Sequence, residues 1–581
     1  MSGKYSDLMR EEDVKRKRIL LSAACIVVIL TFCIGIGLSR LAVGNVDVTE
    51  GVEKIEEQSG EDVEAVEKRL LDAFAGEEPD LSGWKPSDEK KSNPAAEAAS
   101  WKRWAGTEGM GAASFFLLFL LPVLALYYIV PKGGRNAMFA VLSAWIFAWG
   151  RPVPACIFAL WAVLHYFGGF YIHVRRQRKR SAGWLPAVMA GVDLCVLTLL
   201  RVFAKEFLPV GTTWFLLGQL SYVIDVYKGR AEVQTSGGAY AAYSFFFPVM
   251  TAGPVLQYAR MEKQLSGREE TLGNFARGIQ NMLTGLAKVL WIGDSMARIF
   301  VETGMAELAA SGMGEQTAGR GAGAAAGLAV QASGTAAEAW IGTLALGAAL
   351  YFTMSGLSDI ARGLGRLFGF ELPENFTYPY LAESMREFWR RCNRTLCGWF
   401  GTYIYAPLKA GLGTLPGRLA ALFLTWILLG CCHGIALRFL LWGVFMGLLL
   451  VLETAFTGKL KAKLPKAVRI LWQYLLVTAG WVILFAGTPD AMVQWFGRLA
   501  GIGTKGIVDT KALYLLKENW LVWLSACVGC TPFVKRIYMA LVQRERQAHP
   551  WINALVFSIL FLLCVTWILG GGGQYLPALA L

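Results

Sequence analysis

One histidine interrupts a long apolar run in the segment Leu428-Leu429-Gly430-Cys431-Cys432-His433-Gly434-Ile435-Ala436-Leu437. The surrounding stretch is long and apolar enough to cross a bilayer, and an ionisable side chain at that depth is costly, so it indicates a functional site. Histidine is also the side chain whose proton can move near neutral pH. A core histidine with satisfied hydrogen bonds is the alternative interpretation of His433.

The chain has four histidines, and only one other competes for this role. His165 lies in an apolar segment that we expect to be helical. His173 precedes a basic cluster and His549 precedes a proline, so both are expected at the surface.

The composition predicts a polytopic membrane protein. Of the 581 residues, 55% are hydrophobic and only 17% are charged. The net charge of +13 is concentrated in short basic clusters, at 15–18, 175–180 and 459–466. The positive-inside rule makes these clusters cytoplasmic. They flank apolar spans, which argues against nucleic-acid binding.

The eleven cysteines lie mostly inside apolar runs and do not resemble a disulfide framework. Cys527 and Cys530 have the spacing of a metal or redox pair, but no second pair and no histidine lies near them. We interpret them as membrane packing and predict no metal site.

The first 111 residues divide into three parts. Residues 1–18 are polar and predict a cytoplasmic N-terminus, and residues 19–38 predict a transmembrane anchor. A secretory signal peptide is the alternative for 19–38, although no clear cleavage site follows. Residues 39–111 are acidic, with fifteen acidic against five basic residues between 41 and 90. We expect them to be an extracytoplasmic segment, acting as a tether or as a docking helix for a partner.

From residue 112 the chain is almost continuously apolar. We expect a core over 112–500 and C-terminal transmembrane helices over 501–581. Individual candidate spans include 238–258, 418–453, which is long enough for two crossings, and 514–544. Pro and Gly interrupt several runs, and irregular backbone at membrane depth is tolerated only inside protein or beside a cavity. The expected fold is therefore an all-α polytopic membrane protein with a cavity.

Residues 355–410 are too polar to face lipid and too aromatic for a solvated loop. Such a stretch is typical of an interfacial or re-entrant element. Within it, Glu387, Arg390, Arg391 and Arg394 have helical spacing. They could form salt bridges that hold the element in place, or receive an anionic acyl donor.

Several ordered motifs resemble the membrane-bound O-acyltransferase family, and most closely its bacterial branch that modifies alginate, related exopolysaccharides or teichoic acids. The motifs are Pro209-Val210-Gly211, Leu220 to Tyr227, Phe247-Pro248, Ala252-Gly253-Pro254, Ser355 to Ala361, Pro373-Glu374-Asn375-Phe376, Tyr378-Pro379-Tyr380, Glu387-Phe388-Trp389-Arg390-Arg391, His433-Gly434 and Leu441-Trp442-Gly443. The resemblance covers roughly residues 112–500. It implies a multi-helix core with re-entrant elements around a transmembrane tunnel.

The resemblance also implies roles for individual residues. His433 matches the family's intramembrane histidine, which is proposed as the general base. Asn393 stands where bacterial members usually have a second histidine, and its amide could orient a substrate group without shuttling a proton. Trp389, Arg390 and Arg391 would shape the donor entrance. The motif residues Glu387, Asp359 and Tyr378 complete the expected substrate-binding set. Cys392 and Cys432 replace tryptophans of the family pattern, which reduces bulk near the expected site.

The expected function is transfer of a small acyl group to a hydroxyl of an extracytoplasmic polysaccharide or cell-envelope polymer. Acetyl is the acyl group that we favour. A buried neutral imidazole can take the proton of an attacking alcohol, and a thioester is already activated. The donor would be an acyl-CoA or acyl-carrier-protein thioester arriving from the cytoplasm, and we expect no tightly bound cofactor. The protein would be a multi-pass protein of the plasma membrane.

The sequence shows no Gly-x-Ser-x-Gly elbow with triad partners. A separate extracytoplasmic esterase-type acyltransferase is therefore implied as a partner by the resemblance. Two alternatives remain open at this point. One is D-alanyl transfer to teichoic acid from a carrier protein. The other is a catalytically inactive scaffold or transport subunit.

Overall fold

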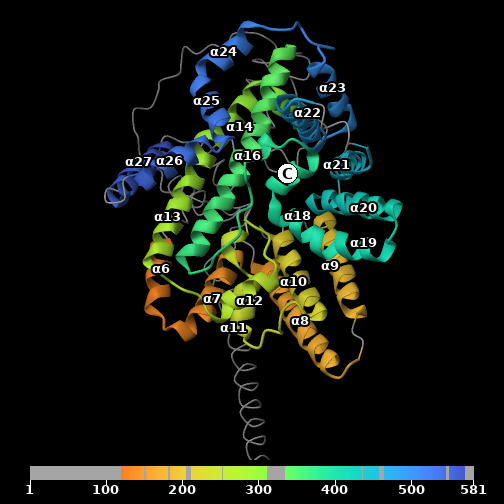
Figure 1. The fold of residues 1–581 in the computed structure, drawn as a ribbon, viewed down its shortest axis with the longest axis vertical. Helices are drawn as coiled ribbons and strands as arrows, with labels where there is room; N and C mark the ends of the chain where they lie inside the picture. Colours follow the sequence, from red (N-terminus) through yellow and green to blue (C-terminus); the bar gives the residue numbers. More distant parts are fainter. Residues whose placement is uncertain are drawn as a thin grey trace, which may run out of the picture. The chain divides into compact units, whose positions relative to one another are not determined.

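The computed structural model describes residues 120–148, 152–180, 183–203, 211–250, 253–310, 334–434, 436–456, 464–544 and 549–569. The expected cytoplasmic N-terminus (1–18), anchor (19–38) and acidic segment (39–111) lie outside these residues. Helices are the only regular elements in the described part of the chain (Figure 1). The predicted all-α class is confirmed.

Among the described residues up to 310, ten α-helices occur. They are α6 (Leu120–Ile129), α7 (Arg135–Ala148), α8 (Pro152–Gln177), α9 (Trp184–Phe203), α10 (Thr212–Lys228), α11 (Gly237–Ser244), α12 (Tyr258–Ser266), α13 (Leu272–Ala287), α14 (Asp294–Glu302) and α15 (Met305–Ala310). A π-helical segment, η5 (Lys288–Gly293), joins α13 to α14.

The second half begins with a central helix, α16 (Ala336–Leu367). It continues with α17 (Met385–Arg391), α18 (Arg394–Phe400), the π-helical segment η7 (Gly401–Tyr405), α19 (Ala406–Leu412), α20 (Leu415–His433), α21 (Leu437–Phe456), α22 (Lys466–Phe485), α23 (Pro489–Leu499), α24 (Thr510–Glu518), α25 (Trp520–Gly529), α26 (Phe533–Arg544) and α27 (His549–Leu569). Short 3-10 turns occupy Lys132–Gly134, Phe247–Val249 and Pro379–Leu381.

Five described helices are long and apolar enough to cross a membrane, namely those at Ala155–Gln177, Ala336–Leu367, Leu415–His433, Leu437–Ala455 and Lys466–Phe485. The expected division of 418–453 into two crossings is confirmed by α20 and α21. The single span expected over 238–258 is wrong. There α11 ends at Ser244, and Pro248 and Pro254 prevent a helix from continuing, because proline lacks the N–H that a helix needs. The span expected over 514–544 is likewise replaced by the three short helices α24, α25 and α26.

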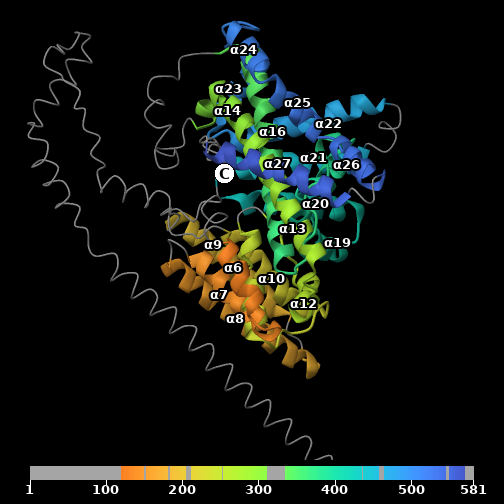
Figure 2. The same cartoon turned by 90° about the vertical axis from the view of Figure 1, so that its left-hand side faces the viewer.

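The packing of α13 against α16 forms the centre of the core (Figures 1 and 2). With 32 residues, α16 is about 48 Å long at 1.5 Å per residue. Glycines allow the two backbones to meet closely. A Cβ on Gly285 would lie 2.5 Å from the carbonyl oxygen of Gly356, and one on Gly278 would lie 3.0 Å from that of Gly363. Small residues at a helix crossing are typical of membrane proteins, where close packing replaces the hydrophobic effect.

The re-entrant element expected over 355–410 is shorter in the structure, because Ser355 to Leu367 form the end of the long helix α16. The element begins with α17 and α18, each seven residues long, and continues into η7. The junction of α17 and α18 is a sharp turn at Asn393, whose φ of 45° lies in the left-handed region that asparagine tolerates better than most residues. Side-chain hydrogen bonds fasten the element to α10. The indole of Trp399 donates to the carbonyl of Leu217 at 3.0 Å, and the Tyr403 hydroxyl donates to Asp225 at 2.8 Å.

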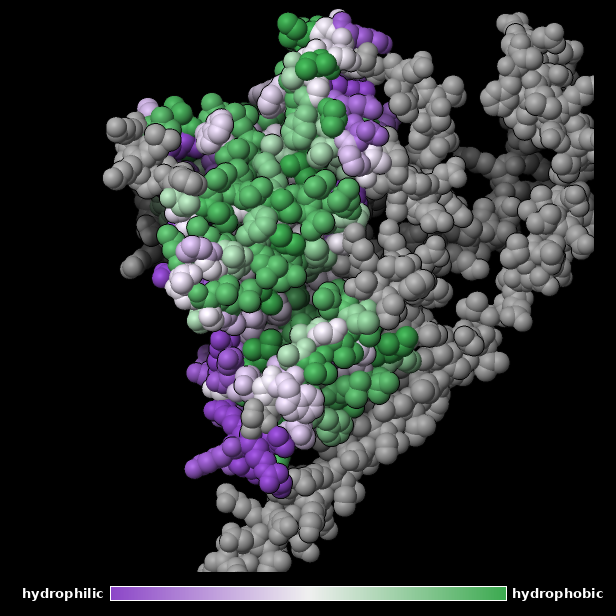
Figure 3. All heavy atoms as spheres, turned by 90° about the vertical axis from the view of Figure 1, so that its right-hand side faces the viewer, coloured by the Kyte–Doolittle hydropathy of each residue, from purple (hydrophilic) through white to green (hydrophobic). Residues whose placement is uncertain are grey.

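One face of the described core shows how apolar and polar side chains are distributed (Figure 3). Hydrophobic side chains form a broad band, and hydrophilic side chains gather below it, at the end where α8 meets α9. The residues at that connection include exposed Arg176, Arg178, Lys179 and Arg180. Such a band bounded by basic residues is what a bilayer-embedded surface requires.

Candidate functional site

The α20–α21 hairpin places His433 at a half-buried position of the core. His433 is the last residue of α20, and the chain turns back into α21 after only a few residues. The two helices pack closely because Gly430 faces Gly443. A Cβ at Gly430 would lie 2.4 Å from the carbonyl oxygen of Phe439, so this position accepts no side chain.

Two aromatic rings of α21 hold the imidazole of His433. The ring of Trp442 lies edge-on to it with centroids 5.6 Å apart, and Phe439 stacks at 6.3 Å. Trp442 is itself almost fully buried. These contacts fix the plane of the imidazole ring in an apolar environment.

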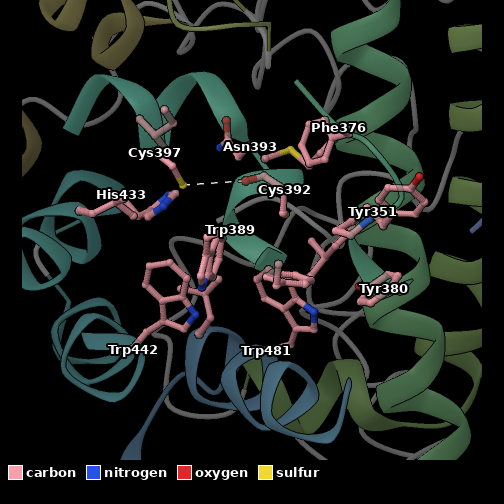
Figure 4. Close-up of a pocket in the computed structure, with 17 residues that line it drawn as sticks. Tyr351, Phe376, Tyr380, Trp389, Cys392, Asn393, Cys397, His433, Trp442 and Trp481 are labelled. Atoms are coloured by element: carbon pink, nitrogen blue, oxygen red, sulfur yellow. Dashed lines mark hydrogen bonds between the residues drawn. The ribbon is translucent and has the colours of Figure 1, made fainter. Parts of the chain in front are cut away.

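His433 lines a pocket at the centre of the re-entrant region, with a volume of about 70 Å³ (Figure 4). Its walls are largely apolar and aromatic. The lining residues are Leu350, Tyr351, Met354, Phe376, Pro379, Tyr380, Phe388, Trp389, Cys392, Asn393, Leu396, Cys397, Leu429, His433, Trp442, Trp481 and Leu484. In Figure 4, Trp389, Trp442 and Trp481 form one wall, while Asn393 and Cys397 enter from the opposite side. The Cys397 thiol contacts the carbonyl oxygen of Cys392 at 3.8 Å.

Three of the residues predicted from the sequence therefore meet at this pocket: His433, Asn393 and Trp389. Asn393 reaches it from the α17–α18 turn, and its side-chain oxygen accepts a hydrogen bond from the amide of Asn375 at 3.2 Å. Trp389 packs between Trp426 and Trp442, with ring centroids at 4.9 and 5.6 Å. Its indole forms part of the pocket wall, and its predicted role at a donor entrance remains a prediction.

The other predicted site residues do not line the pocket. Arg391 forms an ion pair with Glu387 within α17, and Glu387 also accepts a bond from the backbone N–H of Glu383 at 2.8 Å. Arg390 is exposed. Glu387 and Arg391 thus form a salt bridge, as one of the two alternatives expected, and their role in receiving an acyl donor stays a prediction.

Asp359 and Tyr378 lie on neighbouring segments, also outside the pocket lining. Asp359 on α16 pairs with Lys288 of η5 at 2.6 Å and with Arg362 at 3.2 Å. Tyr378 has a φ of 50°, an uncommon conformation for a bulky residue, and precedes the Pro379 turn that contributes to the pocket. Their predicted contact with substrate stays a prediction.

The competing histidine, His165, has a structural environment. It is buried, its Nε2 lies 3.2 Å from a carboxylate oxygen of Asp193, and its Nδ1 lies 3.0 Å from the carbonyl oxygen of Trp161. The indole of Trp161 donates to the same carboxylate at 2.6 Å. This cluster joins α8 to α9 and does not border the pocket, so His165 has the satisfied environment of a core histidine.

Sequence reasoning missed much of the pocket wall. Tyr351 and Trp481 come from two separate segments, and aromatic residues are too frequent in this chain to single them out. Tyr380 was recognised only as part of a motif. Asn375 was recognised only as part of a motif, and its position behind Asn393 was not foreseen. The polarity of Asn375 within an aromatic stretch was the available signal, because a buried amide needs partners.

No group of three or more His, Cys, Asp and Glu side chains suited to a metal ion occurs among the described residues. The polar groups among the lining residues are the imidazole of His433, the amide of Asn393, two cysteine thiols, two tyrosine hydroxyls and three indoles. Of these, only the imidazole is an ordinary general base near neutral pH.

The pocket that holds His433 and Asn393 therefore lies in an all-helical core with helices long and apolar enough to cross a membrane. The sequence model of the MBOAT, or membrane-bound O-acyltransferase, family matches residues 236–484, which include both side chains. The chain is also 32% identical over 436 residues to a probable alginate O-acetylase of Azotobacter vinelandii, covering 71% of this chain and 82% of that relative. The protein belongs to the membrane-bound O-acyltransferase family and is an O-acyltransferase.

Two further relatives show the range of acceptors within the family. A peptidoglycan O-acetyltransferase of Helicobacter pylori is 25% identical, covering 67% of this chain and 79% of the relative. A teichoic acid D-alanyltransferase of Bacillus subtilis is 20% identical, covering 51% of this chain and 74% of the relative.

Proposed function

We propose that this protein transfers an acetyl group from a cytoplasmic thioester to a hydroxyl group of an extracytoplasmic polysaccharide. The observation that carries the proposal is the meeting of His433 and Asn393 in one small, aromatic pocket. A cavity of about 70 Å³ suits a short acyl group rather than a fatty acyl chain. The relatives named for O-acetylation of alginate and peptidoglycan support acetyl over D-alanyl, since their identity to this chain is higher.

The chemistry needs one base and one hydrogen-bond donor. His433 takes the proton from the acceptor hydroxyl as its oxygen attacks the thioester carbonyl. An N–H of Asn393 donates to the carbonyl oxygen, which carries negative charge in the tetrahedral intermediate. As the intermediate collapses, the carbon–sulfur bond breaks and the proton on His433 passes to the leaving thiolate. The products are an O-acetyl ester and a free thiol.

The basic surface at the α8–α9 connection supports a direction for the transfer. The positive-inside rule assigns this end to the cytoplasm, where thioesters such as acetyl-coenzyme A are made. The acceptor polymer would then approach from the opposite end of the core. Where a separate extracytoplasmic esterase-type protein completes the transfer, the hydroxyl that receives the acetyl group here belongs to that partner.

The first experiment compares cells that express wild type, His433→Ala or no protein, with protein amounts matched by immunoblotting. Alkali-released acyl groups from purified envelope polysaccharides are identified and counted. We expect acetate from wild-type cells and its loss in the other two strains. Released D-alanine in place of acetate would support the teichoic acid alternative. Equal ester content in wild-type and His433→Ala cells, with loss only on deletion, would instead indicate a scaffold.

A further inference from the structure

Four hydrogen bonds connect Val255, Thr395, Asn375 and Asn393 behind the pocket, and two of them join Thr395 to Asn375. The bond from Asn375 to Asn393 is the longest of the four. The backbone N–H of Val255 donates to Thr395 Oγ1 at 2.9 Å, and the Thr395 hydroxyl donates to Asn375 Oδ1 at 2.8 Å. The backbone N–H of Thr395 donates to the same oxygen at 3.0 Å, and Asn375 Nδ2 donates to Asn393 Oδ1 at 3.2 Å.

The direction of these bonds is set by backbone groups. A backbone N–H can only donate, so the atom of Asn375 that receives the Thr395 N–H must be its oxygen. The Thr395 hydroxyl already accepts from Val255, which leaves its proton for Asn375. The Asn375 amide is therefore held with its NH₂ group toward Asn393, and it is 2% exposed, so no water competes for it.

The orientation of Asn393 follows from that of Asn375. Because Asn375 offers an N–H, Asn393 must present its oxygen to it, and its own NH₂ group is left for the pocket. In Figure 4 the oxygen of Asn393 points away from His433 and its nitrogen lies on the pocket side. That nitrogen has no hydrogen-bond partner in the described part of the chain, although Asn393 lines the cavity.

We propose that Asn375 is a positioning residue that sets the hydrogen-bond polarity of the pocket. The backbone N–H groups of Val255 and Thr395 fix the orientation of the Asn375 amide. Asn375 in turn makes Asn393 present its NH₂ group, a hydrogen-bond donor, to the substrate. The inference rests on the proposed acyl transfer, in which a donor is needed by the oxyanion and an acceptor would repel it. The left-handed turn at Asn393 keeps the amide within reach of both Asn375 and the pocket.

The test uses membrane vesicles that contain the full-length protein and radiolabelled acetyl-coenzyme A as the probe. Initial rates of O-ester formation give kcat and KM for wild type, Asn375→Ala and Asn375→Asp. Asn519 supplies a matched control, because it is also a buried asparagine that both donates and accepts a side-chain bond, remote from the pocket. Rates are normalised to the amount of folded protein.

We expect Asn375→Ala to lower kcat about tenfold or more, with KM for acetyl-coenzyme A within about twofold, because the donor acts on charge that develops in the transition state. Asn519→Ala should retain wild-type kcat. Asn375→Asp keeps both accepted bonds but can donate only when protonated, which burial favours. Its activity relative to wild type should therefore rise as the pH falls from about 8 to about 6.

Three results would overturn the proposal: wild-type kcat in Asn375→Ala, an equal loss in Asn519→Ala, or a deficit in Asn375→Asp that does not change with pH. A failure of the proposed function looks different, because wild type and His433→Ala would then form the same amount of ester.

Discussion

His433 and Asn393 differ in what each can do with a proton. The imidazole can take a proton and release it, whereas the amide can only donate or accept a hydrogen bond. In the proposed reaction His433 therefore transfers the proton, and Asn393 stabilises the oxyanion. The flanking ring of Trp442 restricts the plane of the imidazole, so the geometry does not depend on the substrate.

Asn393→Asp tests the role of the amide. The aspartate keeps the oxygen that Asn375 contacts but replaces the N–H donor with a second oxygen. We expect kcat to fall on the order of 100-fold, as for loss of one oxyanion donor. Rates of ester formation in vesicles measure this, and Asn393→Gln serves as a control that keeps the amide. A variant with wild-type kcat would show that the amide does not contact the reacting carbonyl.

A substitution at His165, the histidine that competes with His433, tests whether His165 takes part in catalysis. His165→Leu removes the contact with Asp193 and leaves a buried carboxylate with fewer partners. We expect a loss of about 1 to 3 kcal/mol in stability, seen as a lower melting temperature in detergent. Ester formation per folded molecule should stay within about twofold of wild type, since His165 lies outside the pocket. Complete loss of activity in a well-folded variant would mean that His165, too, takes part in catalysis.

At the scale of elements, the close crossing of α13 and α16 supports the site. Gly285→Leu would force a side chain against the backbone of Gly356, which cannot move without separating the helices. We expect a destabilisation of at least about 3 kcal/mol, the upper end of the usual cost of overpacking. Gly191→Leu is the matched control, because a Cβ at Gly191 on α9 has no atom within 4 Å. Equal melting temperatures for the two variants would contradict this view of the crossing.

The ion pairs of Asp359 are a second element-scale feature. They connect α16 to η5 through Lys288, and both partners remain partly exposed. We expect Asp359→Asn to lower stability by about 1 kcal/mol, since exposed pairs contribute little, and to leave KM for acetyl-coenzyme A unchanged. Thermal unfolding and vesicle kinetics together measure this. A large rise in KM with unchanged stability would return Asp359 to the substrate-binding role that the sequence suggested.

Long elements were easier to predict from the sequence than short ones. The apolar runs of α20, α21 and α22 are visible in the sequence. The polar, aromatic stretch at 355–410 indicated the re-entrant element, but its first part was wrong, because α16 continues to Leu367. The failed span at 238–258 shows the limit, because hydropathy does not register the prolines that end α11. The pocket wall could not be predicted, since Tyr351, Trp442 and Trp481 meet only through tertiary packing. Asn375 has a role that depends on hydrogen-bond direction, which no sequence pattern records.

At the scale of the whole protein, the central question is whether acyl transfer through the pocket crosses the membrane. In the proposed orientation the basic α8–α9 connection faces the cytoplasm (Figure 3). The pocket is lined by residues of several helices of the core. A donor and an acceptor that approach from opposite ends would meet at His433. This arrangement would explain how a cytoplasmic thioester can modify a polymer outside the cell.

The most direct measurement adds radiolabelled acetyl-coenzyme A to sealed vesicles of known orientation that contain wild type or His433→Gln. We predict that wild-type inside-out vesicles, whose cytoplasmic face is outward, form labelled O-ester in their lumen. Right-side-out vesicles and all His433→Gln vesicles should form none. Equal labelling in both orientations, or undiminished labelling with His433→Gln, would contradict transfer across the membrane through the His433 pocket.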